Sequence, residues 1–179
     1  MQCIRDASAA AVLGLAILVS GCNNKQPGAG ANKPPRAQYE QAGGFSYDPP
    51  KGWETVNFSG LKYRVSHGPV ANGFAPNINV VDESFAGSLK EYVDGNLANM
   101  KNAFADLTIR KREDFQTEDG LSATRVITEN KQQGRLLRQT FCFFGESKRK
   151  YVATCTTLAD GGEVLDGTFA ESMRTFRLH

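Results

Sequence analysis

Four consecutive strand-like segments, joined by short turns, constrain the fold of this chain more than any other feature. The segments cover residues 107–115, 121–129, 135–144 and 151–158. Asp119 and Gly120 form a strong hairpin signal between the first two, while Gly134 and the run 145–148 mark the next two turns. Strands connected by such short turns pair with their sequence neighbours and run antiparallel. The second half of the chain therefore predicts a four-stranded antiparallel meander.

One amphipathic helix precedes the meander, and a shorter helix follows it. Ser88 and Glu91 have the spacing of a capping box, in which each side chain bonds the free backbone N–H of the other residue. The helix that begins there has one apolar stripe, formed by Leu89, Val93, Leu97, Met100 and Phe104. The second helix, over about residues 166–175, would bury the apolar side chains of Phe169, Met173 and Phe176.

Shorter extended segments lie upstream of the first helix. They cover residues 45–47, 53–58, 61–66 and 78–82. Ser59 and Gly60 form a hairpin candidate, and the glycines and prolines of residues 67–76 predict a loop. The resulting order is strands, helix, meander, helix. That order predicts an α+β fold in which helices flank an antiparallel sheet.

The N-terminal region carries a processing signal. An apolar run from Ala7 to Val19 leads into the sequence Leu-Val-Ser-Gly-Cys, which ends at Cys22 and resembles the lipobox of bacterial lipoproteins. The resemblance implies that residues 1–21 are a signal peptide and that Cys22 becomes the lipidated first residue. The run is shorter than the roughly 20 residues that a spanning helix needs. An ordinary secretory signal or a short anchor, with Cys22 uninvolved, is the alternative.

Residues 22–43 are polar and rich in glycine and proline, which predicts a flexible tether. The remaining residues, 44–179, are sufficient for one domain.

The formal net charge of +2 argues against a nucleic-acid-binding protein. Asn23 follows the lipidated cysteine, and by analogy with enteric bacteria it favours the outer membrane, with the domain on the periplasmic face.

Several short motifs occur in an order that resembles the PsbP-like proteins, including the DcrB-like bacterial lipoproteins. The matching segments are Tyr47 to Trp53, Pro76 to Val81, Ser88 to Tyr92, Gly120 to Ala123, Tyr151 to Cys155 and Thr175 to Leu178. The resemblance covers nearly all of residues 44–178 and implies a PsbP-like αβα sandwich. It also implies binding of another macromolecule without catalysis. No binding residue of the family can be transferred to a position of this chain.

Two cysteines are candidates for a disulfide. Cys142 and Cys155 lie on adjacent predicted strands, at near mirror positions about the turn between them. They could bond if the register places them opposite each other, and an exported location would permit it. The alternative is two reduced, buried cysteines that act as small apolar side chains.

The sequence offers no catalytic constellation and predicts no cofactor or metal. Its two histidines are His67, in a loop, and His179, at the C-terminus, so a zinc site or a hydrolytic triad lacks partners. The basic runs 110–112 and 148–150 are most simply solvated, although lipid head groups or an acidic partner could attract them. We therefore expect a non-enzymatic, lipid-anchored envelope protein that docks on or stabilises another envelope protein. The alternative is a periplasmic carrier with a small-ligand pocket between sheet and helix.

Overall fold

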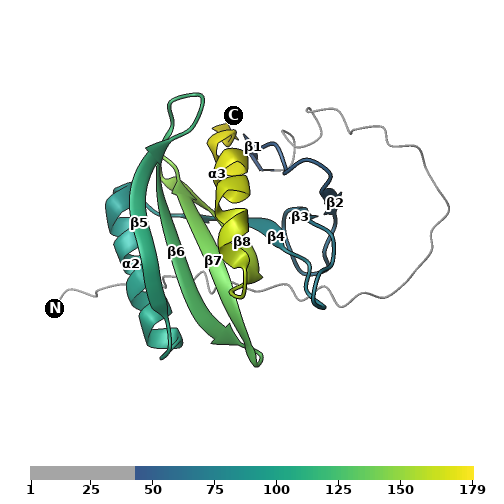
Figure 1. Cartoon of the computed structure of the whole chain (residues 1–179). Coiled ribbons are helices and arrows are strands. Elements are labelled where there is room, and N and C mark those ends of the chain that lie inside the picture. The colour runs from purple at the N-terminus through teal and green to yellow at the C-terminus, as the bar shows by residue number, and fades with distance from the viewer. Residues whose placement is uncertain (1–42) are drawn as a thin grey trace.

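The computed structural model describes residues 43–179, which form three layers (Figure 1). The predicted signal peptide, Cys22 and all but the last residue of the predicted tether lie outside these residues. None of the helices in residues 43–179 combines the length and the apolar composition that crossing a bilayer requires.

A seven-stranded antiparallel sheet forms the middle layer. In spatial order its strands are β2 (Glu54–Val56), β3 (Val65–His67), β4 (Asn77–Ser84), β8 (Arg149–Leu158), β7 (Arg135–Phe144), β6 (Ser122–Gln132) and β5 (Thr108–Gln116). The predicted meander is confirmed as the run from β5 to β8. The pairing of β4 with β8 was not predicted, and it joins the strands before the first helix to the last strand of the meander. A separate pair, β1 (Phe45–Ser46) and β9 (Arg177–Leu178), brings the two ends of the domain together.

Helix α2 (Leu89–Ala103) covers one face of the sheet. The predicted capping box is confirmed, because Ser88 Oγ accepts from the Glu91 backbone N–H and the Glu91 carboxylate accepts from the Ser88 N–H. The buried stripe of the helix packs on strand residues that point to the same face. This cluster contains Tyr92, Val93, Leu97, Met100, Val126, Phe141, Phe143 and Val152.

The opposite face carries a short 3₁₀ helix, η1 (Gly162–Leu165), followed directly by α3 (Asp166–Arg174). The predicted burial of Phe169, Met173 and Phe176 is confirmed. The Phe176 ring lies between the rings of Phe144 and Phe45, with centroids 3.9 and 5.3 Å away. Because neighbouring residues of a strand alternate between faces, Phe143 meets α2 whereas Phe144 meets the α3 side. The helix-flanked α+β fold is confirmed.

The first hairpin is correctly predicted, but its strands are much shorter than expected. The turn at Ser59 and Gly60 is present, with the Leu61 N–H bonded to the Phe58 carbonyl at 3.1 Å. β2 and β3 nevertheless contain only three residues each. Lys62 Nζ and Tyr63 Oη both donate to Asp82 on β4, at 2.7 and 2.8 Å.

Candidate functional site

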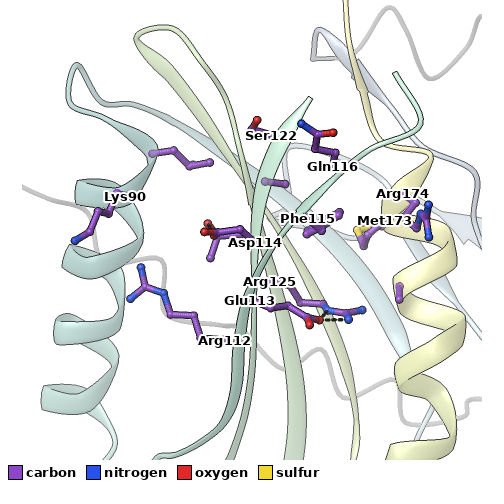
Figure 2. Close-up of a pocket in the computed structure, with 14 residues that line it drawn as sticks. Lys90, Arg112, Glu113, Asp114, Phe115, Gln116, Ser122, Arg125, Met173 and Arg174 are labelled. Atoms are coloured by element: carbon purple, nitrogen blue, oxygen red, sulfur yellow. Dashed lines mark hydrogen bonds and ion pairs between the residues drawn. The ribbon is translucent and has the colours of Figure 1, made fainter. Parts of the chain in front are cut away.

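A groove with a volume of about 870 Å³ lies at the β5 edge of the sheet (Figure 2). Strand β5 runs through its middle, with the start of α2 on one side and α3 on the other. Because side chains alternate along β5, Glu113 and Phe115 face α3, whereas Arg112 and Asp114 face α2. The edge strand therefore divides the groove into two halves of different chemistry.

Two contacts from a single strand place α3 so that the α3 half of the groove stays open. At the start of α3, Asp166 accepts from Arg138 on β7 through two bonds of 3.0 and 2.7 Å. Beyond its end, Phe176 stacks on Phe144, also on β7, with the rings 7° from parallel. The helix thus lies along β7. A helix is about 10 Å wide and strands lie about 4.8 Å apart, so a helix that lies along β7 does not reach across to the edge strand β5.

The α3 half combines an apolar surface with an ion-pair cluster. Phe115 and Ala123 from the strands meet Ala170 and Met173 from α3. Beside them, Glu113 accepts from Lys111 Nζ at 2.7 Å and from Arg125 Nε at 2.7 Å. The bond from Lys111, reinforced by Arg125, outweighs partial burial and holds the pKa of Glu113 below its ordinary value. Glu113 is therefore an ionised acceptor near neutral pH and has no proton to donate.

The α2 half of the groove is electrically balanced. Asp94 on α2 accepts from Lys90 and from Arg112, both at 2.7 Å. Asp114 accepts from the Thr124 hydroxyl, also at 2.7 Å. The two cations on this side are matched by two carboxylates, so this half has no excess charge to offer a ligand.

The two histidines lie outside the groove. His67 is on β3, near the opposite edge of the sheet, with its ring 3.9 Å from the Glu54 carboxylate. His179 Nε2 lies 2.8 Å from Ser46 Oγ, at the paired chain ends. Within residues 43–179, no three side chains of His, Cys, Asp or Glu are placed to hold a metal ion.

The first basic run is paired with carboxylates throughout, whereas in the second run Arg149 has a carboxylate partner and Lys148 is exposed. Arg110 donates to Glu129 at 2.8 Å, and its two neighbours pair with the groove carboxylates described above. In the second run, Arg149 donates to Asp82 at 2.5 Å, while the Lys150 ammonium is buried against backbone carbonyls. These side chains stabilise the domain, and the runs are not simply solvated.

The predicted disulfide is not formed, because the register does not place the two cysteines opposite each other. Cys142 faces Ala153, and Cys155 faces Thr140. Both thiols are free and fully buried on the α3 face. Burial raises the pKa of Cys142 to about 12 and raises that of Cys155 as well. The alternative of two reduced, apolar-like cysteines describes this structure.

The groove and its residues Arg125, Ala170 and Arg174 were not predicted from the sequence. One signal could have indicated it. The last helix has nine residues, about 13 Å, and a single such helix cannot cover the outer face of a four-stranded meander. Phe115, which follows the five charged residues of β5 and is only partly buried, lies at this part.

The sheet order and the helices on both faces define an α+β domain of the PsbP-like architecture, as the sequence predicted. A comparison with models of protein families gives no match, and a comparison with curated proteins gives none. Among solved structures, the chain is similar to CyanoP, the cyanobacterial PsbP of Synechocystis sp. PCC 6803, at 13% identity and a TM-score of 0.54, covering 76% of this chain and 87% of CyanoP. It is also similar to LpqN of Mycobacterium tuberculosis, described as involved in cell envelope biogenesis, and to PA94 of Pseudomonas aeruginosa.

LpqN is 14% identical with a TM-score of 0.57, and the match covers 75% of this chain and 82% of LpqN. PA94 is also 14% identical, with a TM-score of 0.55, and the match covers 69% of this chain and 94% of PA94. At these identities the similarity establishes the fold alone, and the function must be argued from the groove and the sequence.

Proposed function

We propose that this protein is a lipid-anchored, non-enzymatic protein of the bacterial cell envelope that docks on another envelope protein. The observation that carries the docking proposal is the groove between α3 and β5, where apolar side chains lie beside exposed cations. Such a mixture of apolar surface and charged rim is typical of contact sites between proteins. The lipobox ending at Cys22 supports the membrane anchor, and the envelope role described for LpqN is consistent with the location.

Docking through the groove is more favourable than strand addition at a sheet edge. The β5 edge carries Arg110, Lys111 and Arg112, and its register shifts between Ile109 and Lys111. Charged side chains and bulges on an edge strand oppose pairing with another strand. The other edge, β2, is only three residues long. A partner therefore gains more from side-chain contacts in the groove.

Photocrosslinking tests the docking proposal in intact cells. A benzoylphenylalanine at Ala170, in the groove, should give a discrete crosslinked envelope protein. The matched control is the same probe at Ala98, an exposed alanine on α2. Absence of any crosslink from position 170, or identical products from both positions, would contradict docking in the groove.

Membrane fractionation tests the anchor. Cys22→Ala should move the protein from the membrane fraction to the soluble fraction, because the lipid acceptor is lost. Cys3→Ala, in the predicted signal peptide, is the matched control and should remain in the membrane fraction. Density separation of inner and outer membranes then tests the outer-membrane location expected from Asn23. A Cys22→Ala protein that resists a salt wash would refute the anchor.

A small-ligand carrier is the second candidate, because the groove volume of about 870 Å³ lies in the range of ligand pockets. The side chains between the sheet and the two helices are instead buried from solvent, with Val93, Phe141 and Met173 all at most 1% exposed. A carrier of the expected kind would need a pocket there. Native mass spectrometry of the purified protein tests this alternative, since a co-purified small molecule would favour it.

A further inference from the structure

We propose that the α3 half of the groove binds an acidic segment of the partner protein, in which one apolar side chain is flanked by carboxylates. This inference rests on the proposed docking function and specifies the chemistry of the partner. It follows from an excess of positive charge, from an apolar surface of limited extent, and from the contrast with the balanced α2 half.

The positive excess comes from Arg125 and Arg174, which line the α3 half of the groove together with a single carboxylate, Glu113. Lys111 and Arg125 both pair with Glu113. Arg174, at the end of α3, also lines the groove, is exposed, and has no ion pair with any of residues 43–179. Lys111 pairs with Glu113 but does not itself line the groove, and when it is counted, three positive charges stand against one negative charge on this side. A carboxylate on the partner would reduce this imbalance, whereas a basic segment would increase it.

Arg125 is already held in an orientation in which it can donate hydrogen bonds to a second carboxylate. Its Nε and Nη2 both donate to the same oxygen of Glu113. Its Nη1 donates to none of the described residues, and the side chain is 19% exposed. A guanidinium has five N–H donors in a fixed plane, so a bound Glu113 leaves donors for another acceptor. Because the side chain is fixed by Glu113, a partner would lose little rotamer entropy at this position.

The apolar surface of the groove is small, because Ala123 and Met173 line it but are at most 2% exposed, which leaves mainly Phe115 and Ala170. Phe115 and Ala123 come from the strands, and Ala170 contributes only a methyl group from the facing helix. The polar residues Gln116 and Ser122 line one end of this surface, and the Glu113–Arg125 pair lines the other. An acyl chain needs a longer continuous apolar path. A short apolar side chain between acidic residues fits this arrangement better than an anionic lipid does.

The experiment uses the full-length protein in a mild non-ionic detergent and three fluorescein-labelled pentapeptides. The first has four glutamates around a central leucine, the second has four lysines around leucine, and the third has four glutamates around glycine. Fluorescence anisotropy should show binding of the first peptide alone, and that binding should weaken as sodium chloride is raised from about 50 to about 500 mM, because salt screens the charges. Equal binding of the lysine or glycine-centred peptide, or no binding of the first, would overturn the inference.

Two variants locate the binding site. Arg174→Glu should weaken binding of the leucine-centred acidic peptide by about fivefold or more, equivalent to about 1 kcal/mol. Lys101→Glu, which makes the same charge change on α2, should leave it unchanged. An equal effect of the two variants would overturn the site. Crosslinks from position 170 together with no binding of the acidic peptide would overturn this inference alone, whereas absence of those crosslinks would count against docking itself.

Discussion

Truncation of Phe176 provides a sharp test of how α3 is held in place. The side chain is fully buried and lies between the rings of Phe144 and Phe45. Replacing a buried phenylalanine with alanine costs about 3–5 kcal/mol in unfolding free energy, because transfer energy is lost and a cavity remains. We expect the upper part of that range, since two stacked ring pairs are lost together and each contributes about 0.5–1.5 kcal/mol beyond burial.

Urea unfolding followed by the fluorescence of Trp53 measures this cost. Trp53 is the single tryptophan, and its ring lies 6.0 Å from Phe169 on α3, so it reports directly on the helix. With an unfolding entropy of about 2.1 cal/mol/K per residue over the described domain, the loss corresponds to a decrease in Tm of roughly 10–17 °C. Val164→Ala is the control, because Val164 is 80% exposed and should change stability by less than about 0.5 kcal/mol. A loss below about 1 kcal/mol for Phe176→Ala would refute the stacking argument.

Three further predictions concern the buried polar and thiol groups. Arg138→Met should lower the free energy of unfolding in urea by about 3 kcal/mol at pH 7, because it leaves the nearly buried Glu129 with one partner fewer. An unchanged urea midpoint would contradict this. Burial would raise the pKa of Glu129, but bonds from Arg110 and Arg138 hold it below its ordinary value. Ionised Glu129 therefore stabilises the folded state at pH values above the ordinary glutamate pKa, and this stabilisation is lost as the pH falls below it. Glu129→Gln should accordingly lower the unfolding free energy at pH 7, and the difference from the natural protein should shrink below about pH 4. Cys142 and Cys155 should not react with Ellman's reagent in the folded domain, and both should react in urea. If the thiols of these two residues fail to react in urea, they form a disulfide.

The elements that the sequence predicted well are those set by local chemistry. The capping residues Ser88 and Glu91 define the start of α2, and the glycines at positions 120 and 134 adopt the positive φ angles of 81° and 79° that their turns require. These features depend on residues a few positions apart. The lengths of β2 and β3 were overestimated, since their pairing ends at Val56 and Val65. In the segment between them, the side chains of Lys62 and Tyr63 donate to Asp82, a contact between segments about 20 residues apart that no local pattern encodes.

The disulfide prediction shows how a small change in register decides a chemical outcome. Mirror positions about a turn suggested that Cys142 and Cys155 oppose each other, but the actual pairing places Cys142 opposite Ala153. The turn residues fix this register through Gly145, whose φ of 122° is open to glycine but not to larger residues. Two residues of offset keep both thiols on the same face and separate them along the strands, so the sequence spacing alone could not distinguish the bonded from the reduced state.

The groove depends on a choice that the sequence does not display, which is the lateral position of α3. The helix could in principle lie over any pair of strands in the meander, because its apolar stripe would be buried in each case. Arg138 and Phe144, at opposite ends of β7, select one position by binding Asp166 and stacking on Phe176. Each of these pairs joins residues about 30 positions apart, and only together do they leave β5 uncovered. Weakening either contact should therefore loosen the α3 wall of the groove, and Arg138→Met should reduce binding of an acidic peptide even though Arg138 does not line the site.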